Sequence, residues 1–200
     1  MIALIDYGAG NLTSVRKGFA AAGAELFTPR TPSELGTAAG VVVPGVGNFA
    51  ATAVLDGEWT QTIRRAVTAG TPLLGICLGM QWLYDGSDEA PGVKGLGVVP
   101  GTCTRLPQAG GLKVPHVGWN SLHLPHASRL LKGVGDGAQV YFTHSYAAPV
   151  TAEAAATCEH GTAFAAAVER ERIFGVQFHP EKSSDAGVRI LRNFVDATRG

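Results

Sequence analysis

Apolar and amphipathic stretches alternate along the first 85 residues of the chain. Short apolar runs predict buried strands at residues 2–6, 25–27, 41–43 and 72–76. The stretches between and after them predict helices at residues 11–22, 48–70 and 78–84, the first of them with Asn11 as its N-cap and Gly23 as its stop. Repeated strand–helix units imply a parallel sheet joined by right-handed crossovers.

The second half of the chain has a different pattern, in which strands follow one another across short turns. Strands are predicted at residues 98–106, 121–124, 140–146, 151–158, 164–169 and 173–178, with a hairpin turn at 159–161 and a short helix at 127–132. A closing helix at residues 184–198 carries Val188, Leu191, Phe194 and Val195 on one side. We therefore expect one α/β domain over residues 1–200, with a mostly parallel central sheet, flanking helices and an antiparallel strand insertion.

Composition and charge exclude several classes of protein. Sixteen Lys and Arg balance sixteen Asp and Glu, which argues against a strongly basic nucleic-acid binder. The three cysteines show no CxxC spacing, and an odd number of them fits a reducing compartment. The chain begins without a signal-peptide pattern, and its apolar runs are shorter than the ~20 residues of a membrane span. We expect a cytoplasmic protein that binds neither nucleic acid nor membrane.

The segment Gly75–Gly79 has the form of a nucleophile elbow, with Cys77 at its centre. It follows a predicted strand and opens a predicted helix, so its flanking glycines leave room for a tight turn that exposes the central side chain. The positive end of the helix would favour a thiolate at Cys77. The N–H of Leu78 would point at an oxyanion on the attacked substrate. The alternative is a buried structural cysteine after a core strand.

The segment Phe178–Glu181 supplies a base and a carboxylate at the end of another predicted strand. In extended chain His179 and Glu181 face the same side, and Pro180 keeps His179 out of the helical region. Cys, His and a carboxylate are the parts of a nucleophile–base–orienter triad. A solvated His and Glu at a strand end is the competing interpretation. Both segments lie at carboxyl ends of predicted strands, where open α/β sheets place their active sites.

Two weaker patterns are set aside. Gly8-Ala-Gly10 lacks the third glycine and the acidic ribose ligand of a dinucleotide loop. His116, His123 and His126 have no neighbouring Cys or carboxylate cluster that would complete a metal site. We expect no cofactor and no metal, and we expect Cys103 and Cys158, which lack an elbow, to be structural.

Seven motifs in one order resemble those of a known family. Gly75–Gln81 and Phe178–Glu181 are similar to the two signatures of the class I, or triad-type, glutamine amidotransferases. Five further segments resemble the glutaminase subunits of imidazole glycerol phosphate synthase, a group within this family that serves histidine biosynthesis: Asp6–Leu12, Pro44–Gly47, His116–Asn120, Tyr141–Tyr146 and Lys182–Ser183.

The resemblance implies a role for each site residue. Cys77 would attack the amide carbon of glutamine, His179 would move the proton, and Glu181 would orient the imidazole. The segment with Val46 and Gly47 resembles the family's oxyanion strand, in which the Val46 N–H would reorient to complete the hole with Leu78. The substrate-binding residues would be Gln81, His144, Ser145 and Tyr146.

The resemblance also implies a heterodimer with a separate cyclase subunit, expected to be a (β/α)₈ barrel that receives the ammonia. Asn11, Trp119, Tyr141 and Lys182 would lie at that interface. Each has a simpler alternative: Asn11 would be a helix N-cap, Trp119 a core residue and Lys182 a solvated surface charge. Two other functions stay open: the glutaminase subunit of another pathway, such as pyridoxal phosphate or anthranilate synthesis, and a non-catalytic regulatory module with the same fold.

Overall fold

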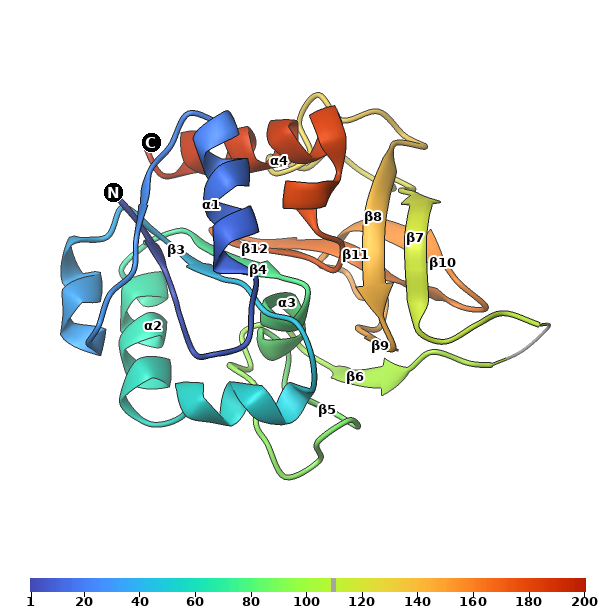
Figure 1. Cartoon of the computed structure of the whole chain (residues 1–200), viewed down its shortest axis with the longest axis horizontal. Coiled ribbons are helices and arrows are strands. Elements are labelled where there is room, and N and C mark those ends of the chain that lie inside the picture. The colour runs from blue at the N-terminus through green and yellow to red at the C-terminus, as the bar shows by residue number, and fades with distance from the viewer. Residues whose placement is uncertain (109–110) are drawn as a thin grey trace.

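The computed structural model describes residues 1–108 and 111–200, and a seven-stranded sheet forms its centre (Figure 1). The strand order is β10-β11-β12-β4-β3-β1-β2. Five neighbouring strands are parallel: β12 (Ile173–Val176), β4 (Leu73–Ile76), β3 (Gly40–Val43), β1 (Ile2–Leu4) and β2 (Leu26–Phe27). At the β12 edge the antiparallel strands β11 (Ala163–Arg170) and β10 (Ala154–Glu159) extend the same sheet.

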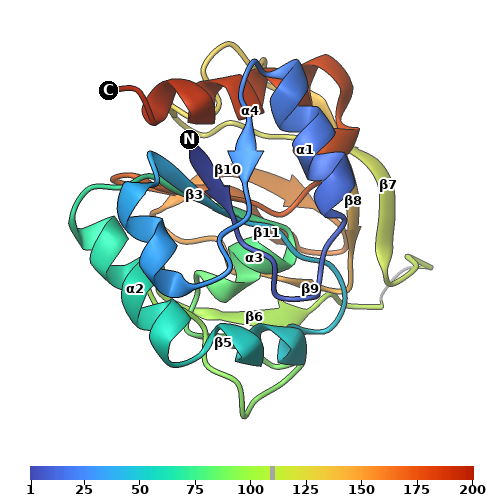
Figure 2. The same ribbon diagram turned by 60° about the vertical axis from the view of Figure 1, so that its left-hand side comes forward.

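Helices cover both faces of this sheet (Figures 1 and 2). On one face α1 (Leu12–Ala21) and α4 (Ser184–Ala197) bury apolar side chains such as Phe19 and Phe194 against the strands. On the other face lie α2 (Glu58–Thr68), α3 (Leu78–Trp82) and the 3₁₀ helices η1 (Pro32–Thr37) and η2 (Phe49–Leu55). Ile2 and Leu4 face the first layer, whereas Ala3 faces the second, as the two-residue period of a strand requires.

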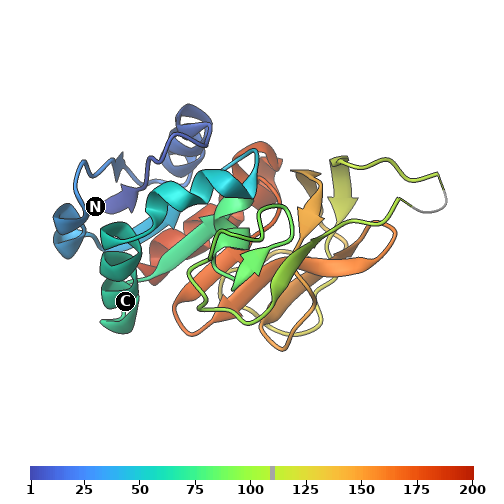
Figure 3. The ribbon, with the colours of Figure 1, turned by 90° about the horizontal axis from the view of Figure 1, so that it is seen from below.

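Smaller sheets lie at the end of the molecule away from the N-terminal elements (Figure 3). One is the antiparallel ribbon of β7 (His116–Ser121) and β8 (Gln139–His144). The other joins β5 (Gly86–Ser87), β6 (Thr102–Arg105) and β9 (Tyr146–Ala147). The 3₁₀ helix η3 (Pro180–Lys182) connects the end of β12 to α4.

The predicted elements of the first half are confirmed, most of them with shorter bounds; β3 begins one residue earlier than predicted, and the helical stretch predicted at 48–70 divides into η2 and α2. Asn11 caps α1 by accepting the Ser14 N–H at 3.1 Å. The predicted strand at 121–124 is wrong. The strand in this region is β7, which ends at Ser121 and pairs with β8 over its full length. The predicted strand at 98–106 shrinks to Thr102–Arg105. Pairing with a partner strand, rather than local hydrophobicity, decides which residues form a strand.

The helix predicted at 127–132 is also wrong, since the segment is a turn. The carboxylate of Glu169, on β11, accepts hydrogen bonds there from Ser128 Oγ at 2.6 Å and from the N–H groups of Arg129 and Leu130 at 2.9 and 3.3 Å. These donors are therefore held by a strand far away in sequence. No helix in residues 1–108 or 111–200 is long and apolar enough to cross a membrane.

Candidate active site

The turn from β4 to α3 places Cys77 at the carboxyl end of the sheet. Cys77 has φ 53° and ψ −106°, a backbone conformation that residues other than glycine rarely adopt. Its N–H donates to the Val176 carbonyl at 2.8 Å. A Cβ at Gly75 would lie 2.5 Å from the Gly79 oxygen, and one at Gly79 would collide with the Val43 carbonyl. Both positions must be glycine, because neighbouring backbone atoms leave no room for a Cβ. The tight, strained turn therefore has the geometry of a nucleophile elbow.

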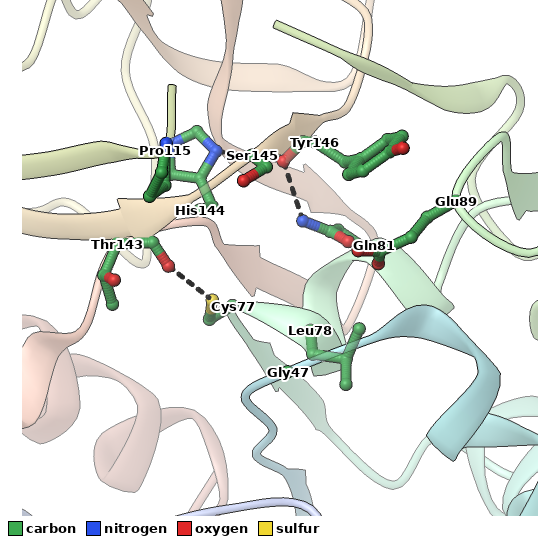
Figure 4. Close-up of a pocket in the computed structure, with 10 residues that line it drawn as sticks. All are labelled: Gly47, Cys77, Leu78, Gln81, Glu89, Pro115, Thr143, His144, Ser145 and Tyr146. Carbon is green, nitrogen blue, oxygen red and sulfur yellow. Dashed lines mark hydrogen bonds between the residues drawn. The ribbon is translucent and has the colours of Figure 1, made fainter. Parts of the chain in front are cut away.

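The sulfur of Cys77 is buried among polar groups (Figure 4). It lies 3.9 Å from the Thr143 carbonyl oxygen, and Gln177 Nε2 donates to it at 3.6 Å. The Gln177 side chain is fully buried and was missed by sequence reasoning. Its signal was a single amide inside the otherwise apolar run that ends in Phe178.

His179 and Glu181 form a buried pair. Nδ1 of His179 lies 2.8 Å from Oε1 of Glu181, and both side chains are 3% exposed. The His179 N–H donates to the Tyr141 carbonyl at 2.9 Å, and the hydroxyl of Ser183 donates to the His179 carbonyl at 2.7 Å. These two bonds fix the main chain at His179. An Nδ1–H donated to Glu181 fixes the ring and leaves Nε2 as the proton acceptor.

The electrostatics of the pair favour the imidazolium. Burial lowers the pKa of His179, but its interactions with Cys77 and Glu181 outweigh burial and raise the pKa to about 9. Within the described part of the chain, Nε2 of His179 and Oε2 of Glu181 are buried without a hydrogen-bond partner. The structure thus brings the three predicted triad residues into one buried cluster with a free ring nitrogen.

A pocket of about 310 Å³ opens beside Cys77 (Figure 4). Its lining residues are Gly47, Cys77, Leu78, Gln81, Glu89, Pro115, Thr143, His144, Ser145 and Tyr146. The predicted substrate residues all line it, as do Gly47 and Leu78, whereas Val46 does not. Glu89 was missed by sequence reasoning, because nothing in the sequence near it marks a site. Its Oε2 accepts the Phe49 N–H at 2.8 Å, which holds a half-buried carboxylate at the pocket wall.

Both predicted oxyanion donors are occupied by backbone acceptors. The Leu78 N–H donates to the Gly45 carbonyl at 3.3 Å, and the Val46 N–H donates to the Ala9 carbonyl, also at 3.3 Å. The Gly45 carbonyl and the Val46 N–H belong to one peptide group. The predicted oxyanion hole is therefore closed in this structure, and the orientation of this single peptide accounts for both engaged donors.

His144 is tied into a buried hydrogen-bonded chain. Nδ1 of His144 lies 2.9 Å from the Tyr146 carbonyl oxygen, and Nε2 lies 3.1 Å from Nδ1 of His116. Burial lowers the pKa of His116 to about 4 and that of His144 to about 3. Gln81 Nε2 donates to the same Tyr146 carbonyl at 2.9 Å and to Gln177 Oε1 at 3.1 Å. These side-chain hydrogen bonds hold the pocket wall formed by residues 144–146 in place.

The four residues predicted at an interface lie beside the triad. Trp119 is 52% exposed, so it is not a core residue, and it packs edge-to-face on Tyr141 at 6.1 Å. The ammonium of Lys182 lies 5.6 Å from the centre of the Tyr141 ring. Asn11 and Lys182 line a small cavity together with His179 and Glu181.

Across the two described ranges, no group of three or more His, Cys, Asp or Glu side chains is arranged to hold an ion. His116 stacks on His160, while His123 pairs with Asp136. Cys103 and Cys158 are buried in the core, and burial raises the pKa of both thiols.

Comparison with known proteins agrees with this geometry. Residues 3–198 match the family model described as glutamine amidotransferase class-I. The chain is 49% identical to the imidazole glycerol phosphate synthase subunit HisH of Gloeobacter violaceus, over 98% of this chain and 88% of that one. It is 45% identical to the HisH subunit of Methanothermobacter thermautotrophicus, over 100% of both chains.

Solved structures share the fold at low identity. A crystal structure of a glutamine amidotransferase superposes with a TM-score of 0.78 at 18% identity, covering 100% of both chains. The structure of PurLQS from Thermotoga maritima gives 0.75 at 16% identity, covering 98% of this chain and 97% of that one. The chain therefore belongs to the class I glutamine amidotransferase family and, within it, to the HisH subunits of imidazole glycerol phosphate synthase.

Proposed function

We propose that this chain hydrolyses glutamine to glutamate and ammonia with Cys77, His179 and Glu181 as its catalytic triad. The observation that carries the proposal is the meeting of a cysteine elbow and a buried His–Glu pair at the carboxyl ends of two adjacent strands, β4 and β12, beside a pocket. The family supports glutamine as the substrate. A non-catalytic module would have no need of the strained backbone at Cys77.

The reaction proceeds in two steps. The Cys77 sulfur attacks the side-chain amide carbon of glutamine, while Nε2 of His179 takes the thiol proton. The tetrahedral intermediate collapses, the C–N bond breaks, and His179 returns the proton to the departing ammonia. Water, activated by the same imidazole, then attacks the thioester and releases glutamate and the free thiol. Glu181 stabilises the imidazolium throughout.

The oxyanion hole requires one backbone rearrangement. Rotation of the Gly45–Val46 peptide would break its two 3.3 Å hydrogen bonds, release the Leu78 N–H and turn the Val46 N–H toward the developing charge. Gly45 lies on one side of the rotating peptide and carries no side chain, which gives the strand the freedom that this rotation needs. Two donors at this position are typical of acyl-transfer sites.

Charge in the pocket supports recognition of the amino-acid end of glutamine. The Glu89 carboxylate is fixed through one oxygen by Phe49 and can accept the α-ammonium group with the other. Backbone groups of Ser145 and Tyr146 would bind the α-carboxylate, while the Gln81 side-chain amide is held in the pocket wall by the Tyr146 carbonyl and by Gln177.

A partner is needed to consume the ammonia. We propose that the exposed face with Asn11, Trp119, Tyr141 and Lys182 binds a separate cyclase subunit, which uses the ammonia to form imidazole glycerol phosphate and aminoimidazole carboxamide ribonucleotide. The closed oxyanion hole supports gating, because a partner that binds the open state more tightly shifts the chain toward it. Lys182 follows Glu181 directly and can transmit such a contact.

The test measures glutamate release by the chain alone, with its cyclase partner, and with the partner plus its nucleotide ligand. We expect slow hydrolysis by the isolated chain and a large increase in the liganded complex. Cys77→Ala should abolish hydrolysis in all three while ammonium-dependent synthesis by the complex survives. Cys158→Ala, at another buried cysteine, is the matched control and should retain hydrolysis. Normal hydrolysis by Cys77→Ala would disprove the triad, and equal wild-type rates in the three conditions would disprove gating alone.

A further inference from the structure

Tyr7 carries a buried hydroxyl that the mechanism has not used. The residue follows β1 at the carboxyl edge of the sheet and is 8% exposed. Its hydroxyl oxygen is buried and receives no hydrogen-bond partner from residues 1–108 or 111–200. An unpaired buried hydroxyl destabilises the folded state, so its presence calls for a physical reason.

The hydroxyl packs directly on the peptide that closes the oxyanion hole. A Cβ placed on Gly45 would overlap the Tyr7 hydroxyl oxygen and would lie 2.9 Å from Leu78 Cβ. Tyr7 therefore occupies the space next to the Gly45 α-carbon, one bond from the carbonyl that now accepts the Leu78 N–H. Only glycine at position 45 allows this approach.

The hydroxyl is a donor under all ordinary conditions. Burial, followed by the charge of Cys77, raises the pKa of Tyr7 well above its usual value. It therefore keeps its proton next to Gly45, whose carbonyl is engaged with the Leu78 N–H. When the Gly45–Val46 peptide turns, that carbonyl loses its present donor and needs another.

We propose that Tyr7 is a positioning residue whose hydroxyl donates to the turned Gly45 carbonyl and thereby favours the open oxyanion hole. The inference rests on the proposed function, since it concerns the hole that serves glutamine hydrolysis. In the closed state the hydroxyl is unpaired, and in the open state it gains an acceptor. An interaction made in one state only shifts the equilibrium toward that state.

The test is Tyr7→Phe in the full complex with the cyclase partner and its nucleotide ligand. Loss of one hydrogen bond made only in the open state should lower kcat for glutamine about 5- to 30-fold, with KM unchanged. Alkylation of Cys77 by iodoacetamide needs no oxyanion hole and should proceed at the wild-type rate. The thermal midpoint should stay the same or rise, because the variant removes an unpaired buried hydroxyl.

Tyr84→Phe is the matched control. Tyr84 is also fully buried with an unpaired hydroxyl in the described structure, but its ring packs beside Gly101 rather than on the oxyanion strand. Its variant should retain kcat. Wild-type kcat in Tyr7→Phe would overturn the inference, and so would a loss of kcat accompanied by slower alkylation and a lower midpoint. Both results leave the triad intact, because the triad is tested by Cys77→Ala.

Discussion

Gly18 is a glycine inside helix α1, and we predict that Gly18→Ala slows catalysis although it removes a poor helix former. A Cβ at this position would lie 2.9 Å from Leu191 Cδ1, 3.0 Å from Glu181 Cβ and 3.3 Å from Glu181 Cα. The Leu191 methyl group can rotate away. Glu181 cannot do so without moving its backbone, because η3 is bonded to β8 through Ser183.

Two opposing effects set the stability of this variant. Alanine improves helix propensity by about 1 kcal/mol. Overpacking typically costs about 1–3 kcal/mol. We therefore expect the free energy of unfolding to fall by about 0–2 kcal/mol. The gain in helix propensity does nothing to offset the effect on catalysis. The distance of 2.8 Å between His179 Nδ1 and Glu181 Oε1 must change by a few tenths of an ångström. If a misplacement of 1 Å costs about 100-fold, a third of that costs roughly 5-fold in kcat.

The assay is glutamine-dependent glutamate release by the liganded complex across a pH series, with urea unfolding of the same variant. Glu181 helps to raise the pKa of His179 to about 9, so a weaker contact should lower it. The protonated ring delivers the proton to ammonia, and the alkaline decline of activity should therefore move to lower pH. Gly36→Ala, where a Cβ meets nothing within 4 Å, is the control and should change neither rate nor profile. A Gly18→Ala protein that is about 1 kcal/mol more stable, with unchanged kcat and pH profile, would refute the reasoning.

Three further predictions concern the pocket and the base. His179→Ala should lose about 10²–10⁴-fold in kcat for glutamine, because the general base and acid are removed; steady-state kinetics of the complex measure it, and wild-type turnover would contradict the assignment. Glu89→Gln should raise KM for glutamine more than it lowers kcat, since the carboxylate binds a group remote from the reacting carbon; an unchanged KM would remove Glu89 from the binding site. The pKa of His116 is about 4 and that of His144 about 3, below the ordinary 6.5, so the unfolded chain binds protons first as pH falls. The free energy of unfolding should therefore decline below pH 6.5, with a slope of up to about 1.4 kcal/mol per pH unit for each histidine; urea titrations from pH 7 to 5 should show a shallower decline in His116→Gln, and parallel curves would count against the buried neutral pair.

Local chemistry in the sequence was enough to predict the elbow and the base. The turn around Cys77 requires glycine at fixed positions, and the pairing of His179 with Glu181 follows from two-residue spacing and an intervening proline. The alternation of strands and helices predicted the parallel half of the sheet for the same reason, since each element is encoded within its own stretch of chain.

Only the tertiary structure decided the features that join distant segments. Hydrogen bonds from residues 128–130 to Glu169, about forty positions later in the sequence, replaced the helix predicted at 127–132, and the register of β7 came from its partner strand. Glu89 and Gln177 became site residues because the fold brings them to Cys77 and its pocket. The closed oxyanion hole and the unpaired hydroxyl of Tyr7 likewise depend on where the Gly45 peptide lies relative to two other loops. Such contacts are absent from any local pattern, because their energy arises only after chain segments far apart in sequence have packed together.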